Sequence, residues 1–355
     1  MRSVSPRYNM GGLDRCNPLH ASLPIRFWGL RVSLINPVSL GIPSLPGFID
    51  DDTLRDTQCS STPNVSNEHF PTVYAFGDSL SDAGNDFVAT GMHLPVSPPY
   101  YQGHFSNGLT WVEDLALSQG LGPLAPSLLP GGTDFAFGGA ETGTTPLHDV
   151  GPTDLPSQLA QFEANYPTPQ SGALYTLSIG ATDLFDAIAA FPSTPFKALA
   201  DVVVAVANVD HFVLQLASHG AKDFLILNAP DIGKAPAYSS QGPRVSSTAS
   251  ALSRLFDIGL TASLNAIAAK DHLNLNIVDT YSLIDTAVAD PSMFGFTNVT
   301  DPVWTGNNTN PNSGVLQATT PAAQSQYLFW DQVHPTSAAH LVLANTAEST
   351  LLHTI

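Results

Sequence analysis

From residue 71 onward, short apolar runs alternate with longer segments that have the periodicity of helices. The runs predict strands at 72–76, 135–137, 174–179, 224–227 and 273–278, and helices at 109–119, 155–164, 196–218, 245–270 and 337–352. Strands that are apolar on both faces are typical of a parallel sheet covered by helices on both sides. The pattern therefore predicts a single α/β domain over residues 71–355.

Residues 1–70 lack this sustained periodicity. The apolar stretch at 23–49 is interrupted by Arg26, Arg31 and four prolines, so it predicts neither a membrane-spanning helix nor a clean signal peptide. We interpret residues 1–70 as a poorly ordered N-terminal extension or the product of a wrongly chosen start codon. A degenerate or misplaced signal is the alternative.

The charge of the chain limits the classes of partner that it can bind. The formal net charge is −18, and residues 71–355 carry six Lys and Arg against 24 Asp and Glu. Such a surface disfavours nucleic acid and tight adsorption to anionic membranes. We therefore expect no nucleic-acid partner and no stable membrane insertion. The low charged fraction of 12% is typical of secreted enzymes and favours a secreted or cell-envelope location.

Metal and cofactor chemistry has little support in the sequence. The two cysteines, Cys16 and Cys59, precede residue 71, and the histidines lack the spacing of metal ligands. We therefore expect no metal in the main domain.

The strongest candidate for chemistry is the run F-G-D-S-L-S-D-A-G-N at residues 76–85, directly after a predicted strand. Ser79 then lies just past the carboxyl end of a parallel strand, where open α/β sheets place their sites. A lone G-D-S triplet would more often be a capped polar turn, but the extended run favours a nucleophilic serine.

A nucleophilic serine needs a base, and the run Y-L-F-W-D-Q-V-H-P-T at residues 327–336 supplies one. The three-residue spacing lets Asp331 curl back toward one ring nitrogen of His334, which leaves the other nitrogen free to face Ser79. Asp331 as a helix cap and His334 as a packing residue are the structural alternative.

Together these residues resemble the GDSL/SGNH hydrolase family, in particular its lecithinase, haemolysin and secreted-esterase branch. Members of that branch begin F-G-D-S-L-S-D-x-G-N and end F-W-D-x-x-H-P-T, and blocks at 104–113, 135–140 and 295–302 are also similar. The resemblance runs from about Val73 to about Leu351. It implies a three-layer α/β/α, flavodoxin-like fold with a mainly parallel sheet. It also implies a Ser, His, Asp site that uses neither a metal nor an organic cofactor.

The resemblance also implies three donors to the oxyanion: the backbone N–H groups of Ser79 and Gly139, and the side-chain amide of an asparagine in a G-x-N-D block. Gly138 is the alternative register for the glycine. This chain reads G-A-T-D at residues 180–183, so Thr182 stands where the asparagine is expected.

A threonine hydroxyl is a shorter donor than an amide and often bonds a backbone carbonyl instead. Loss of one oxyanion donor lowers turnover by about 10²- to 10³-fold. We therefore expect either a slower esterase or a third donor from elsewhere, for which Asn85 and Asn107 are candidates.

The sequence thus predicts a serine ester hydrolase of the esterase or lipase type that forms an acyl-enzyme on Ser79. Its expected partner is a small-molecule or lipid ester, and we expect the protein to be a monomer. A carbohydrate acetylesterase, or a binding protein of the same fold impaired by Thr182, are the alternatives. No G-x-S-x-G pentapeptide occurs, which excludes the usual α/β-hydrolase elbow. Six aromatic side chains favour an acyl chain over a bare acetyl group, although each can equally belong to the core: Phe87, Tyr100, Tyr101, Phe105, Phe185 and Phe329.

Overall fold

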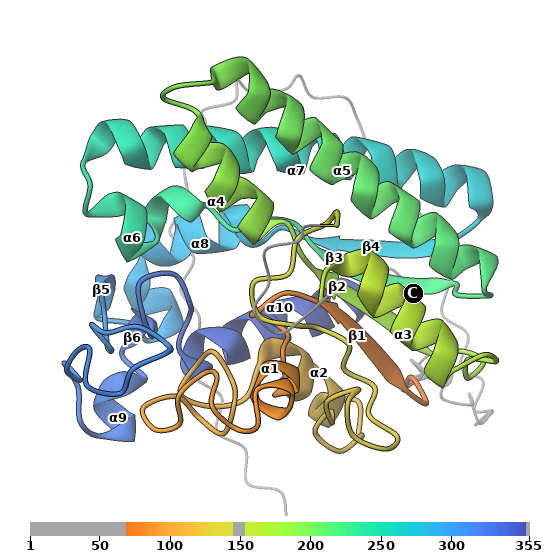
Figure 1. Cartoon of the computed structure of the whole chain (residues 1–355), viewed down its shortest axis with the longest axis horizontal. Helices are drawn as coiled ribbons and strands as arrows, with labels where there is room; N and C mark the ends of the chain where they lie inside the picture. Colours follow the sequence, from red (N-terminus) through yellow and green to blue (C-terminus); the bar gives the residue numbers. More distant parts are fainter. Residues whose placement is uncertain (1–68, 145–152, 353–355) are drawn as a thin grey trace, which may run out of the picture. The chain divides into compact units, whose positions relative to one another are not determined.

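The computed structural model describes residues 69–144 and 153–352, which all belong to one compact unit, Val65–Ile355 (Figure 1). The prediction for residues 1–70 falls almost entirely outside these ranges and stays a prediction. Four parallel strands form the main sheet: β1 (Val73–Gly77), β2 (Leu174–Ser178), β3 (Asp223–Leu227) and β4 (Asn274–Val278). They lie in the order β1-β2-β3-β4.

The register of this sheet brings the carboxyl ends of its strands to one edge. Gly77 pairs with Ser178, Ser178 with Leu227, and Leu227 with Val278. Side chains that follow these four residues therefore meet at the same edge, where open parallel sheets bind their ligands.

The strand predicted at 135–137 is only partly present. The segment runs along the free edge of β1, where Ala75 exchanges backbone hydrogen bonds with Thr133 and Phe135, and Phe137 donates to Gly77. Its pairing is reduced to an isolated parallel bridge between Ala75 and Asp134, because Oε1 of the buried Gln158 accepts the N–H of Gly77 and so ends the ladder. Counted as a second strand, it gives the order 2-1-3-4-5 of flavodoxin-like folds, as predicted.

Alternate side chains of the sheet enter two separate cores, as period-two strands buried on both faces require. One face carries Tyr74, Phe76, Tyr175, Leu177, Phe224 and Ile226, and the other carries Val73, Ala75, Leu174, Leu225 and Leu227. The first core is covered by α3 (Leu155–Asn165), α4 (Ala181–Ala190), α5 (Pro195–Ser218) and α7 (Pro243–Asp271). The second is covered by α2 (Trp111–Ser118) and α10 (Ser337–Leu352). Figure 1 shows these helices above and below the sheet, which gives the three layers predicted.

Shorter elements complete the described part of the chain. They are α1 (Asn85–Ala89), η1 (Ile232–Lys234), α6 (Pro236–Ser239), α8 (Thr280–Ala289), η2 (Pro291–Phe294), β5 (Asn298–Pro302), α9 (Pro321–Gln324) and β6 (Tyr327–Phe329). The parallel pair β5-β6 forms a second small sheet. Residues of α8, β6 and α10 share a small apolar cluster at the carboxyl edge of the main sheet.

The most apolar helix is α5. Its mean hydropathy reaches 1.5 over 18 residues, enough by length and composition to cross a bilayer. Core helices of soluble proteins meet the same criterion, and α5 buries seven side chains, Val202, Val209 and Phe212 among them, in the first core. Its length and hydropathy are thus also those of a helix packed on a sheet.

Candidate active site

Ser79 lies on a tight turn at the carboxyl end of β1. Gly77, the last residue of the strand, has φ of +139°, and a Cβ there would collide with the carbonyl oxygen of Ser178. Asp78 donates its N–H to that same carbonyl at 3.0 Å, and Ser81 and Asp82 donate theirs to the carbonyl of Asp78. The turn therefore fixes Ser79 just beyond the sheet edge, as the sequence predicted.

The second predicted block folds into a turn around the Asp331 carboxylate. Oδ1 of Asp331 accepts the backbone N–H groups of Val333 at 2.9 Å and His334 at 2.8 Å, and Trp330 donates to the carbonyl of His334. Oδ2 of Asp331 lies 2.7 Å from Nδ1 of His334, and Nε2 of His334 lies 2.9 Å from Oγ of Ser79. The structure thus joins three side chains that are up to 255 residues apart in the sequence.

The electrostatics of this chain favour a basic imidazole. Burial acts to raise the pKa of Asp331, but the charge and hydrogen bond of His334, with donors from Tyr100 and Val333, outweigh burial and lower it. Burial acts to lower the pKa of His334, but the charge and hydrogen bond of Asp331 raise it above 6.5. With Nδ1–H donated to the carboxylate, Nε2 is the acceptor that faces the Ser79 hydroxyl.

Two of the aromatic residues expected at the mouth have other roles. Tyr100 is buried, and its hydroxyl donates a 2.6 Å hydrogen bond to Oδ2 of Asp331. Phe105 is also buried and packs its ring 5.3 Å from the imidazole of His334. Both side chains therefore support the histidine and aspartate instead of contacting a substrate.

The backbone N–H groups of Ser79 and Gly139 form the best-placed candidate oxyanion donors. Ala140 donates to the carbonyl of Phe137 across a β-turn in which Gly139 has φ of +72°, a conformation that favours glycine. Gly138 donates its N–H to Oδ2 of Asp82 at 3.0 Å. Among the described residues, no acceptor takes the N–H of Gly139 or of Ser79, which favours the Gly139 register.

Thr182 lies in the first turn of α4 and lines the same cavity as Ser79 and His334. No described residue forms a hydrogen bond with its hydroxyl, so the expected competition from a backbone carbonyl is not seen within the described ranges. The next residue, Asp183, accepts the N–H of Thr142 at 3.0 Å and its hydroxyl at 2.7 Å. This contact ties the start of α4 to the loop that carries Gly139.

The two asparagines considered as replacement donors are structural, which corrects that expectation. Asn85 is fully buried, and its side-chain amide donates hydrogen bonds to the carbonyls of Asp134 and Ala136. Asn107 donates to the side chain of Gln324 and accepts the N–H of Ser337 at the start of α10. The Asn85 amide therefore has no hydrogen left for an oxyanion, and the Asn107 amide is held between α9 and the start of α10.

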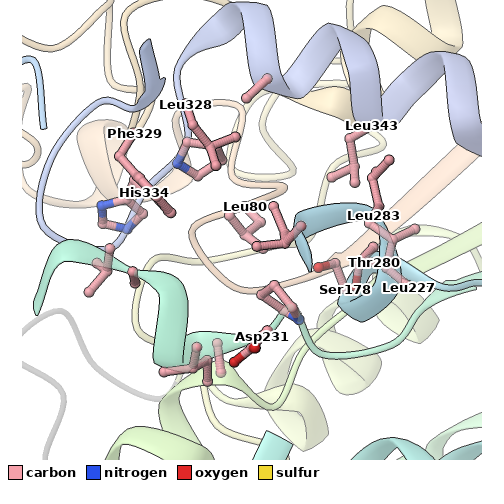
Figure 2. Close-up of a pocket in the computed structure, with 18 of the residues that line it drawn as sticks. Leu80, Ser178, Leu227, Asp231, Thr280, Leu283, Leu328, Phe329, His334 and Leu343 are labelled. Carbon is pink, nitrogen blue, oxygen red and sulfur yellow. The ribbon is translucent and has the colours of Figure 1, made fainter. Parts of the chain in front are cut away.

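An apolar cavity extends from Ser79 and His334 along the carboxyl edge of the sheet, between α8 and α10 (Figure 2). Its apolar lining includes Leu80, Leu227, Leu283, Leu328, Phe329 and Leu343, and polar atoms come from residues such as Ser178 and Thr280. Of the six aromatic residues expected at the mouth, Phe185 and Phe329 line this cavity. Within residues 69–144 and 153–352, no cluster of three His, Cys, Asp or Glu side chains is placed to hold a metal ion.

Comparison with known proteins identifies the family. Residues 73–347 match the family model for GDSL-like lipases and acylhydrolases. The chain is 32% identical over 311 residues to a thermolabile hemolysin of Vibrio parahaemolyticus, an alignment that covers 84% of this chain and 66% of that protein. It is 27% identical to a phosphatidylcholine-sterol acyltransferase of Aeromonas hydrophila, over 78% of this chain and 89% of that protein. The superposition on the crystal structure of phospholipase A1 from Streptomyces albidoflavus covers 79% of this chain and 99% of that chain, with a TM-score of 0.39 and 15% identity.

The chain therefore belongs to the GDSL-like lipase/acylhydrolase family. It is a hydrolase that acts on ester bonds, and the family to which it belongs acts on small-molecule or lipid esters.

Proposed function

We propose that the chain hydrolyses carboxylic esters of aliphatic acids through an acyl-enzyme on Ser79. The observation that carries the proposal is the hydrogen-bonded chain from Ser79 through His334 to Asp331, with contacts of 2.9 and 2.7 Å. A serine hydroxyl is a weak nucleophile until a base accepts its proton, and this arrangement supplies both the base and the group that orients it.

In the first half of the reaction, Oγ of Ser79 attacks the ester carbonyl carbon while Nε2 of His334 takes the hydroxyl proton. The negative oxygen that forms is stabilised by the N–H groups of Ser79 and Gly139 and by the Thr182 hydroxyl. When the intermediate collapses, the bond to the alcohol oxygen breaks and the proton on His334 passes to the departing alcohol. The acyl group stays on Ser79.

In the second half, His334 takes a proton from water, and the resulting hydroxide equivalent attacks the acyl carbon. Collapse of this second intermediate returns the proton to Oγ of Ser79 and releases the carboxylic acid. Asp331 stabilises the imidazolium in both halves without changing its own protonation. Its lowered pKa agrees with that role.

The cavity beside Ser79 supports an acyl chain of several carbons. Burial of each methylene contributes about 0.8 kcal/mol, so leucine-lined walls favour an aliphatic chain over an acetyl group. The net charge of −18 supports an uncharged or zwitterionic ester as the substrate. We further propose a monomer without stable membrane insertion that is secreted or located in the cell envelope.

A panel of p-nitrophenyl esters from acetate to palmitate tests the proposal, with Ser79→Ala as the control. We expect kcat/KM to peak at medium chain length and to vanish in Ser79→Ala. A maximum at acetate would support a carbohydrate acetylesterase instead. Folded protein that is inert toward every ester would support a binding protein impaired at Thr182.

A further inference from the structure

Asp82 connects the nucleophile loop with the turn that carries Gly139. The residue is fully buried, and its carboxylate accepts four backbone N–H groups. Oδ1 accepts from Gly84 at 2.8 Å and from Asn85 at 2.6 Å, and Oδ2 accepts from Asp86 at 3.3 Å and from Gly138 at 3.0 Å. Three of these donors lie at the start of α1, which follows the Ser79 turn, and the fourth belongs to the turn that carries Gly139.

The structure leaves no space for a side chain at position 138. A Cβ there would collide with the ring of Phe105 and lie 2.6 Å from Oδ2 of Asp86. The Gly138 N–H is thus held against a carboxylate on one side, while Phe105 closes the other. The following peptide N–H, that of Gly139, takes its direction from this turn.

A second buried carboxyl, Asp86, keeps the charge on Asp82. Burial and the neighbouring charge of Asp82 raise the pKa of Asp86, whereas the four N–H donors of Asp82 offset part of the effect of its own burial. The larger number of N–H donors therefore favours the negative charge on Asp82, and that charge disfavours ionisation of Asp86. An ionised carboxylate accepts a stronger hydrogen bond from Gly138 than a neutral one would.

We propose that Asp82 is a positioning residue for the oxyanion, because its carboxylate holds the Gly138–Gly139 turn so that the Gly139 N–H points at the developing charge. The inference rests on the proposed function, in which Gly139 is one of the donors. Asp82 touches no reacting atom itself. Loss of the Asp82 carboxylate should therefore reduce the stabilisation of the transition state without changing the affinity for the ground-state ester.

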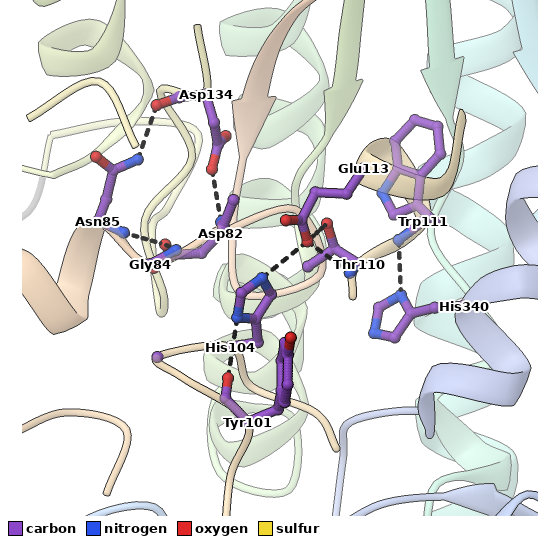
Figure 3. A network of polar contacts seen from close by, with 12 residues as sticks. Asp82, Gly84, Asn85, Tyr101, His104, Thr110, Trp111, Glu113, Asp134 and His340 are labelled. Carbon is purple, nitrogen blue, oxygen red and sulfur yellow. Dashed lines mark hydrogen bonds and ion pairs between the residues drawn. The ribbon is translucent and has the colours of Figure 1, made fainter. Parts of the chain in front are cut away.

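A matched control is available in the same network (Figure 3). Asp134 is equally buried, and its carboxylate accepts the N–H of Ala83 at 2.6 Å and that of Ala136 at 3.0 Å. Asp134 thus joins the same two segments as Asp82 but makes no hydrogen bond to the turn itself. A general loss of packing should affect both variants alike, whereas an oxyanion defect should appear only at Asp82.

The test compares Asp82→Asn with Asp134→Asn, with kcat expressed per active site counted by fluorophosphonate titration. An asparagine at 82 keeps one oxygen for Gly84 and Asn85 but turns an amide donor toward Gly138. We expect kcat to fall about 10- to 100-fold with KM nearly unchanged, because small misplacements of catalytic donors have effects of this size. The affinity for an alkyl boronic acid, whose tetrahedral adduct mimics the intermediate, should fall by the same factor. Asp134→Asn should keep kcat within about threefold, since its turn keeps the Asp82 contact.

Gly138→Ala is the second variant, and it applies even where Asp82→Asn yields little folded protein. It leaves Asp82 in place but pushes the turn away, so kcat should fall while the acid limb of the pH profile, set by His334, stays in place. Equal kcat losses in the two aspartate variants, or a wild-type kcat in Gly138→Ala, would overturn the inference. An active wild-type protein with unaffected variants would overturn this inference alone and leave the proposed function standing, because the proposed function fails only on its own tests, such as an inert wild type or an active Ser79→Ala.

Discussion

Oδ2 of Asp331 is shared: it accepts a 2.6 Å hydrogen bond from the hydroxyl of Tyr100 and lies 2.7 Å from Nδ1 of His334. Tyr100 is separated from Asp331 by 231 residues and comes from the loop before α2. The carboxylate that orients the imidazole is therefore itself held from a distant segment. Because the two donors share Oδ2, the Tyr100 hydrogen bond reduces the stabilisation that Asp331 gives to protonated His334.

Tyr100→Phe should raise the pKa of His334. Without the hydroxyl, Oδ2 of Asp331 is a stronger acceptor for Nδ1–H and stabilises the protonated imidazole more. The acid limb of kcat/KM should therefore move to higher pH. The melting temperature should fall, because a hydrogen bond to a buried charge is worth about 1.5–3 kcal/mol. Tyr101→Phe, at a neighbouring position that is 37% exposed, is the control and should change neither quantity. An unmoved acid limb in Tyr100→Phe would contradict this account of the shared oxygen.

The pH dependence of hydrolysis follows from the raised pKa of His334. The residue accepts a proton only when neutral, so kcat/KM should rise with pH through an apparent pKa above 6.5. Asp331→Asn removes the charge that raises this pKa, so the limb should move to lower pH. Turnover should fall by about 10³- to 10⁴-fold, because the imidazole also loses its orientation. A limb that stays in place in Asp331→Asn would show that another group titrates.

Thr182 limits the rate if its hydroxyl is a poor donor to the oxyanion. Thr182→Asn restores the amide of the family pattern and should raise kcat about 10-fold with KM nearly unchanged. Thr182→Val removes the hydroxyl with little change of shape, so a strong loss of kcat would show that threonine already donates. Unchanged kcat in both variants would place the third donor elsewhere.

The cavity predicts how chain-length preference responds to substitution. Leu283 lines it from α8, so Leu283→Phe should shorten the space and move the optimum of the nitrophenyl ester panel to shorter acyl chains. Overpacking of this kind costs about 1–3 kcal/mol of stability. Leu341→Phe makes the same change at a residue of α10 that is 50% exposed and outside the cavity, and it should leave the optimum alone. Equal chain-length profiles in both variants would exclude this cavity as the acyl site.

Much of the fold could be predicted because its strongest signals are periodic. The long apolar helices α5, α7 and α10 begin and end within two residues of the predicted ranges. The short helices α4 and α8 were missed, since each begins within three residues of a strand end and is only ten residues long. The segment at 135–137 has the apolar composition of a strand, but its pairing with β1 ends where the buried Gln158 accepts the N–H of Gly77, which no local pattern reveals.

In the candidate site, the predicted Ser79, Asp331 and His334 come together, because fixed motifs determine local turns. Contacts between motifs were not predictable in the same way. The Asp82 to Gly138 bond and the Tyr100 to Asp331 bond depend on how distant loops fold over the sheet edge. The S-D pair that follows Ser79 was the available signal for Asp82, whereas Tyr100 stood in a loop without regular pattern.

Covalent labelling of Ser79 tests the central claim most directly. The folded protein is treated with a fluorophosphonate, and the modified peptide is identified by mass spectrometry in the wild type and in His334→Ala. The account predicts one adduct, on Ser79, that forms at least about 100-fold more slowly in His334→Ala, because general-base assistance of this kind contributes about 10²- to 10⁴-fold. An adduct on another serine with Ser79 unmodified, or equal labelling rates in the two proteins, would contradict it.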